Sequence, residues 1–63
     1  MRYKLQNRYQ DSGWEELGEQ FSNLNDANRR AHDLSKDAIC YGMVRVVDVT
    51  NGIVEAEYPA GGP

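Results

Sequence analysis

The sequence predicts a small α+β domain in which one helix packs on one face of a three- or four-stranded, mainly antiparallel sheet. Three observations predict this fold. Residues 2–9 alternate between polar and apolar, residues 24–36 repeat apolar side chains at helical spacing, and residues 44–58 form two β-prone runs around an Asn-Gly turn. With 63 residues the chain is long enough for one domain. We expect this domain to span residues 1–58, followed by a flexible tail at 59–63.

The first predicted strand covers residues 2–9, whose sequence is RYKLQNRY. A period of two is typical of a half-buried strand. One predicted face carries Tyr3, Leu5 and Tyr9, and the other carries Arg2, Lys4, Gln6 and Arg8. A turn at residues 11–13 leads to a possible second strand at residues 14–18. Trp14 and Leu17 would not share a face of an ideal strand, so a bulge or a loop also fits. The element order is therefore ββαββ or βαββ.

The helix is predicted from Leu24 to about Lys36. Asn23 is a favourable N-cap residue, and Asp26 places negative charge in the first turn, where the helix dipole favours it. The apolar stripe consists of Leu24, Ala27, Ala31 and Leu34. Two alanines make this stripe narrow, so the helix can lie close to a sheet. We expect Phe21 and Ile39 to seal its two ends.

Two further strands are predicted, from about Gly42 to Asp48 and from about Ile53 to Tyr58, and Pro59 ends the second. The Asn-Gly turn allows two registers. With a two- or four-residue loop, one face of the hairpin carries Met43, Arg45, Val47, Val49, Val54, Ala56 and Tyr58. The other face then carries Val44, Val46, Asp48, Ile53, Glu55 and Glu57. With a three-residue loop and a bulge at Gly52, one face carries Val44, Val46, Val54, Ala56 and Tyr58. The other face then carries Arg45, Val47, Val49, Ile53, Glu55 and Glu57. Both registers leave Ile53 and two valines on the face that the helix does not cover.

The strand order stays open at this point. The basic side chains of the first strand and the acidic ones of the fourth would form cross-strand pairs if these two strands were neighbours. The valine-rich third strand, in contrast, favours a central position for itself.

The chain resembles short bacterial and phage proteins of no established function that have a ββαββ pattern. They share an Arg/Tyr-rich first strand, a tryptophan after a turn, a Phe before a capped Ala-rich helix, and a VRVVD…G hairpin. The matching residues are Tyr3, Arg8, Trp14, Phe21, Ala27, Val44 to Asp48, and Gly52. The resemblance implies the ββαββ fold and carries over no active site.

Composition limits the function classes. The single cysteine, Cys40, excludes an internal disulfide and suits a reducing compartment, and no cysteine-histidine set exists for a zinc site. We therefore expect no metal and no cofactor. Because the chain has neither an apolar leader nor an apolar run long enough for a membrane span, we expect a cytoplasmic protein without membrane contact. A net charge of −3 argues against a dedicated nucleic-acid partner.

The favoured function is non-catalytic protein–protein interaction, with homodimerisation through the exposed sheet face or an edge strand as the concrete form. Domains of this size often gain stability from oligomerisation, and an apolar patch with a polar rim is typical of an interface. The candidate apolar centre is Val44, Val46 and Ile53 in one register and Val47, Val49 and Ile53 in the other. The candidate rim is Arg45, Glu55 and Glu57.

Two alternatives rank below this one. A small nucleic-acid-binding or regulatory module would use the basic face of the first strand, with Arg2, Lys4 and Arg8. Catalysis by His32 and Cys40 would need an orienting group and an oxyanion donor, which the sequence does not nominate. We therefore expect that the protein is not an enzyme.

Overall fold

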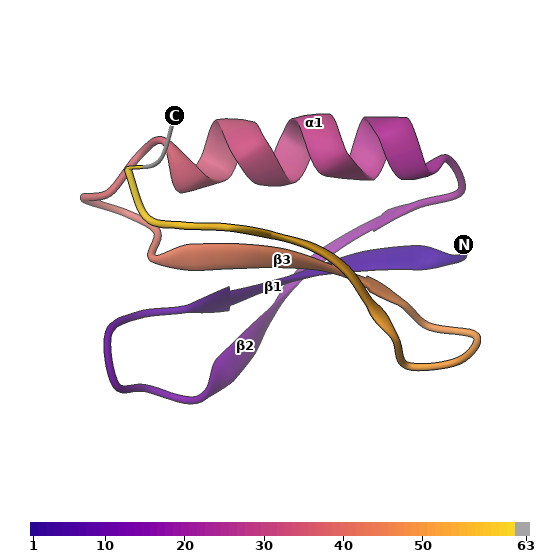
Figure 1. The fold of residues 1–63 in the computed structure, drawn as a ribbon, viewed down its shortest axis with the longest axis horizontal. Coiled ribbons are helices and arrows are strands. Elements are labelled where there is room, and N and C mark those ends of the chain that lie inside the picture. The colour runs from indigo at the N-terminus through magenta and orange to yellow at the C-terminus, as the bar shows by residue number, and fades with distance from the viewer. Residues whose placement is uncertain (62–63) are drawn as a thin grey trace.

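Four antiparallel strands and one helix follow one another in the order ββαββ in the computed structural model, which describes residues 1–61 (Figure 1). The α+β fold predicted from the sequence is confirmed, with four strands rather than three. The strands form one open sheet with the order β2-β1-β3-β4, and α1 lies along one side of it. The elements are β1 (Tyr3–Arg8), β2 (Trp14–Phe21), α1 (Leu24–Ser35), β3 (Met43–Asp48) and β4 (Val54–Tyr58).

The two central strands are β1 and β3, which pair along their whole length. The valine richness of β3 therefore indicated its central position correctly. Because β3 lies between β1 and β4, the first and fourth strands are not neighbours. Among residues 1–61, the basic side chains of the first strand and the acidic ones of the fourth form no ion pair with each other.

The helix begins where the sequence predicts. The side-chain oxygen of Asn23 accepts the backbone N–H groups of Asn25 (2.7 Å) and Asp26 (3.3 Å), which otherwise lack a partner at a helix N-terminus. The last helical residue is Ser35, followed by Lys36 as the C-cap. The Ser35 hydroxyl donates to the carbonyl of His32 at 2.9 Å, which satisfies a polar group that is fully buried.

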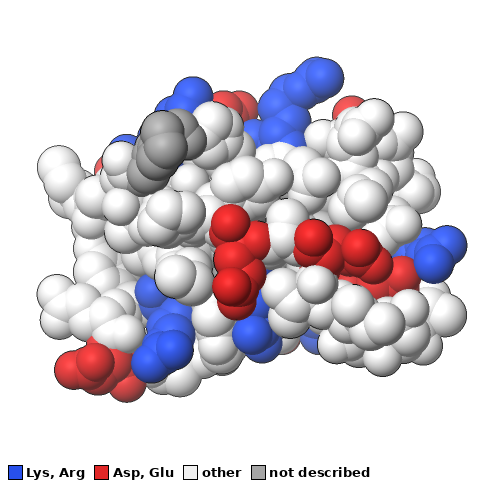
Figure 2. Space-filling view, viewed as in Figure 1, with Lys and Arg blue, Asp and Glu red and all other residues white. Residues whose placement is uncertain are grey.

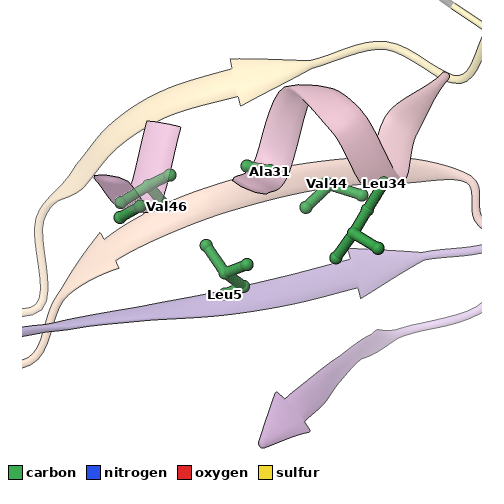
Figure 3. Close-up of a cluster of buried hydrophobic side chains, with 6 residues drawn as sticks. Leu5, Ala31, Leu34, Val44 and Val46 are labelled. Carbon is green, nitrogen blue, oxygen red and sulfur yellow. The ribbon is translucent and has the colours of Figure 1, made fainter. Parts of the chain in front are cut away.

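The hydrophobic core lies between α1 and the sheet face that it covers, the inner face. Figure 3 shows the strand side chains Leu5, Val44 and Val46 pointing toward Ala31 and Leu34 of the helix. All five are buried, together with Ala27. Larger, half-buried side chains pack around this cluster: Tyr3, Leu17, Phe21, Leu24, Tyr41 and Tyr58. The alanines of α1 thus let the helix approach the sheet, and the aromatic residues close the margins.

The prediction for the C-terminal end of the helix is wrong. Ile39 was expected to seal this end, but it is 87% exposed. The reason is the turn after the helix, in which the Asp37 carboxylate accepts the N–H groups of Ile39 and Cys40, both at 3.2 Å. Ile39 therefore lies in an Asx turn within residues 36–40, all of which are exposed. Tyr41 packs against the core instead.

The second strand is longer than the predicted residues 14–18 and contains a bulge. Between the pairs Lys4–Gln20 and Gln6–Glu16, three residues of β2 oppose one residue of β1. Gly18, in the middle of the three, has a φ of +82°, a conformation that glycine adopts without strain. Trp14 lies opposite Arg8 on the face away from α1, whereas Leu17 packs on the core.

The β3–β4 hairpin combines the two registers that the sequence allows. Four residues, 49–52, connect Asp48 to Ile53, whose carbonyl accepts the Asp48 N–H at 2.9 Å. The next pair is Val47 opposite Val54, as a four-residue loop requires, but the following pair is Val46 opposite Ala56. Glu55 is therefore an extra residue, and this bulge shifts the remaining pairs by one. As a result, Val44, Val46, Ala56 and Tyr58 face α1, while Arg45, Val47, Val54 and Glu57 face away from it.

The chain after β4 returns toward the helix. The N–H of Gly61 donates to the carbonyl of Ser35 at 2.6 Å. The flexible tail predicted at 59–63 stays a prediction, and its last two residues, 62–63, lie outside the described part of the chain.

Candidate functional site

The outer face of the sheet, the one opposite α1, is not covered by any helix or strand among the described residues. Its composition is mixed, with cations, carboxylates, valines and the one tryptophan of the chain. The pairing of the strands places the following residues on it: Lys4, Gln6 and Arg8 of β1; Trp14, Glu16 and Gln20 of β2; Met43, Arg45 and Val47 of β3; Val54 and Glu57 of β4.

The centre of the outer face is a polar network that crosses three strands. The Arg45 Nε donates to the Gln6 Oε1 at 2.7 Å, the Gln6 amide donates to Glu16, and the Lys4 Nζ lies 3.3 Å from the Glu16 Oε1. The Arg45 guanidinium also lies over the ring of Trp14, 3.9 Å from its centroid. A cation at this distance from an aromatic face is attracted to it. The network therefore holds Trp14 and Arg45 in defined positions on an otherwise open surface.

Apolar side chains gather at the end of the sheet where β3 turns into β4. Val47 and Val54 oppose each other on the outer face, and Val49 and Ile53 adjoin them in the chain. We call these four residues the apolar corner. Val47 is buried, whereas Val49, Ile53 and Val54 are 43%, 55% and 38% exposed. Three β-branched side chains thus remain in contact with solvent in one region.

A buried aspartate, Asp48, lies between Val47 and Val49 of the apolar corner in the chain. The side chain of Asp48 is fully buried, and its carboxylate accepts the Thr50 N–H and the Arg2 Nε–H, both at 2.9 Å. The backbone of Asp48 makes two further hydrogen bonds. Its N–H donates to the Ile53 carbonyl at 2.9 Å, and its carbonyl accepts the Gly52 N–H at 2.7 Å. In addition, the Val49 N–H donates to the Arg2 carbonyl at 2.8 Å. The loop is therefore fixed to the beginning of the first strand.

The charge of Asp48 is stabilised by these partners. Burial by itself favours the protonated acid, but the hydrogen bonds from Thr50 and Arg2, together with the positive charge of Arg2, outweigh burial and lower the pKa of Asp48. The same pair raises the pKa of Arg2. Sequence reasoning considered Asp48 only as part of a register. An Asp followed by Thr-Asn-Gly is a typical turn sequence, and this signal could have indicated its role.

The candidate interface residues separate into two groups. Val44 and Val46 are fully buried beneath α1. The candidate interface centre formed by Val44, Val46 and Ile53 is therefore excluded. Arg45, Val47 and Glu57 lie on the outer face. The remaining three are exposed at the same end of the hairpin: Val49, Ile53 and Glu55. Sequence reasoning missed Val54, because both registers placed it with Ala56 and Tyr58, and it missed the bulge that separates them.

The two edges of the sheet carry negative charge. The exposed residues Glu55 and Glu57 lie on β4, and Figure 2 shows acidic side chains on the front of the molecule, where β4 passes in Figure 1. On the other edge, β2, Glu16 lies next to Lys4 and Glu19 is bound by Arg30 through two nitrogens at 2.9 and 3.1 Å. A short, bulged or charged edge strand resists pairing with another strand.

The basic side chains at the N-terminal strand do not form a free cationic surface. Arg2 binds Asp48, and Lys4 binds Glu16. Trp14 does lie on the same face as Lys4 and Arg8, which the sequence left open. Paired cations contribute less to the attraction of nucleic-acid phosphates than free ones. The alternative of a nucleic-acid module stays a prediction, with two of its three proposed cations already bound to carboxylates.

His32 and Cys40 have separate surroundings. The His32 ring packs on Tyr58, with the ring centroids 5.4 Å apart. Cys40 is exposed, and a hydrogen bond with Asp37 raises the pKa of its thiol. A raised pKa reduces the thiolate fraction that a nucleophile needs. Within residues 1–61 no group of three or more His, Cys, Asp or Glu side chains is placed to hold a metal ion.

Comparison of the chain with protein-family models, curated proteins and solved structures finds no match. In the part of the chain that the structure describes, no helix has the length and hydrophobicity to cross a membrane.

Proposed function

We propose that this chain is a non-catalytic protein–protein interaction module that forms a homodimer through the apolar corner of its outer face. The observation that carries the proposal is the group of exposed Val49, Ile53 and Val54 beside Val47. An apolar patch with charged residues around it is typical of an interface. Hydrogen bonds of Asp48 with Thr50, Gly52 and Ile53 fix the loop between β3 and β4. The surface is therefore ordered before a partner binds, which lowers the entropic cost of association.

A two-fold interface requires a self-complementary surface, since the same patch is present on both subunits. The rim of the apolar corner contains both signs of charge, because Arg45 lies opposite Glu57 on the same face. An arginine of one copy can therefore approach a glutamate of the other. Association of β4 edges is less favourable, since Glu55 and Glu57 would meet the same charges of a second copy.

Sedimentation equilibrium at several protein concentrations tests this proposal. We expect the unmodified chain to dimerise, and Ile53→Lys to be monomeric at the same concentrations with an unchanged far-ultraviolet circular dichroism spectrum. The matched control is Ile39→Lys. Ile39 is more exposed than Ile53 but lies in the α1–β3 connection, so this variant should dimerise normally.

The two variants distinguish a specific interface from general stickiness. Equal weakening by Ile53→Lys and Ile39→Lys would show that exposed isoleucines associate without a defined patch. An unmodified chain that stays monomeric at high micromolar concentration would remove the homodimer.

A further inference from the structure

The loop between β3 and β4 contains Asn51, the one asparagine of the chain that is followed by glycine. This loop lies at the lower right of Figure 1, and both Asn51 and Gly52 are exposed. An asparagine side chain is thermolabile, because the backbone nitrogen of the next residue can attack its carbonyl carbon. Glycine hinders this attack least, since it has no Cβ atom. The pair therefore has the covalent chemistry of a modification site.

We propose that Asn51 is a deamidation site whose rate is set by the hydrogen bonds of the loop. The reaction begins when the Gly52 N–H loses its proton to hydroxide or another base in the solvent. The nitrogen then forms a bond with the Cγ of Asn51, and the bond from Cγ to Nδ2 breaks. Nδ2 takes a proton from water and leaves as ammonia, and a cyclic succinimide remains. Water opens this ring at either carbonyl, which gives aspartate or isoaspartate.

The folded loop engages both reacting groups. The Gly52 N–H donates to the carbonyl of Asp48 at 2.7 Å, and this bond must break before the proton can leave. The Oδ1 of Asn51 accepts the N–H of Ile53 at 2.9 Å, which restrains the carboxamide in an Asx turn. Folding therefore slows the reaction.

Asp48 controls how often the loop opens. Its buried carboxylate accepts the Thr50 N–H, and its own N–H donates to the carbonyl of Ile53, both at 2.9 Å. These bonds lie at one end of the hairpin, so the loop can open locally while the core beneath α1 stays packed. When opening and closing are fast, the rate of a slow reaction follows the population of the open state. The deamidation rate therefore reports the opening of this loop.

The two products differ in their fit to the loop. Aspartate keeps a side-chain oxygen that can accept the Ile53 N–H. Isoaspartate lengthens the main chain by one methylene within the connection of residues 49–52, so the bond between Asp48 and Ile53 cannot keep its geometry. Both products add a negative charge beside Ile53, at the apolar corner. The reaction itself does not depend on the dimer, since it needs only the loop.

Peptide mapping by mass spectrometry tests the proposal on the full chain, incubated at mildly alkaline pH with and without guanidinium chloride. We expect Asn51 to convert to aspartate and isoaspartate in the denatured chain. In the folded chain the conversion should be about tenfold or more slower, since the open state is the minor one. The rate should rise with pH, because the Gly52 nitrogen attacks only after it has lost its proton.

Asp48→Asn should speed the reaction in the folded chain several-fold, because it removes the ion pair with Arg2, and should leave the rate in guanidinium chloride unchanged. Arg2→Gln, which removes the same ion pair from its exposed side, should act in the same way. The matched control is Leu5→Val, which weakens the buried core but lies outside the loop. This variant, folded by circular dichroism, should react at the rate of the unmodified chain.

Three results would overturn the proposal. The first is an Asn51 that stays intact in the denatured chain, and the second is an equal rate with and without guanidinium chloride. The third is a rate in the folded Asp48→Asn and Arg2→Gln variants that is no greater than the rate in Leu5→Val.

Discussion

The two faces of the same sheet are organised by different interactions. On the inner face, Leu5, Val44 and Val46 are excluded from water by α1 and pack in the apolar core. On the outer face, Arg45, Gln6 and Glu16 form a hydrogen-bonded network in contact with solvent. Burial of apolar surface stabilises the inner face, whereas hydrogen bonds between polar side chains organise the outer face.

This difference has a consequence for energetics. Burial contributes about 25 cal/mol per Å² of apolar surface, so the inner face supplies most of the folding free energy. Exposed ion pairs contribute under about 1 kcal/mol. The outer face can therefore change its side chains at low cost to the fold, and this freedom makes it the suitable face for binding. Three experiments test this difference.

Leu5→Ala should destabilise the protein most. Truncation of a fully buried leucine removes apolar contacts and leaves a cavity, which costs about 2–5 kcal/mol. Val54→Ala, on the outer face, should cost at most about 1 kcal/mol. Urea unfolding followed by circular dichroism, with both variants in the same oligomeric state, measures the two losses. Equal losses would mean that the two faces do not differ in this way.

Asp48→Asn should rank second, and its effect should depend on pH. The lowered pKa of Asp48 stabilises the fold above the ordinary value of 3.8, and this stability is lost as the pH falls below that value toward the folded-state pKa. The variant should therefore be less stable than the unmodified chain at neutral pH, and the gap should narrow below 3.8. Thermal unfolding across this range measures it. A gap that is constant with pH would contradict the assigned ion pair with Arg2.

The pair formed by Trp14 and Arg45 should contribute least. A double-mutant cycle with Trp14→Ala and Arg45→Ala should give a coupling free energy of about 0.5–1 kcal/mol. The matched cycle of Trp14→Ala with Arg29→Ala, on the helix surface, should give none. Coupling of the same size in both cycles would show that the stacking of Arg45 on Trp14 contributes nothing specific.

Local patterns predicted the elements well. The helix starts at Leu24 as expected, because its start depends on Asn23 and on a four-residue repeat that are both local. The strands of residues 2–9 and 44–58 follow from alternation and from the Asn-Gly turn. Ile39 was placed wrongly, because the local sequence does not indicate whether an apolar residue just after a helix is buried or exposed.

The candidate site was predicted only in part. Ile53 was expected on the uncovered side in every register, and it is exposed. Val54 and Trp14 were not recognised as members of the outer face. Their positions depend on the bulge at Glu55 and on the pairing of Arg8 with Trp14. The pocket at one end of the sheet, which is lined by residues of β1, the α1–β3 connection and the chain after β4, was not predicted, because these three segments are distant in the sequence.

Sequence patterns alone were enough to establish one helix on a sheet of three or four strands, a core containing Leu5 and the helical alanines, and an Ile53 that stays outside. Which valines of β3 are buried was settled by tertiary contacts. The Asp48 loop requires Val47 to oppose Val54, while packing against α1 requires Ala56 and Tyr58 to face inward. Strict alternation cannot satisfy both demands, and the extra residue at Glu55 reconciles them. That solution depends on the position of the helix, which no residue of the hairpin encodes.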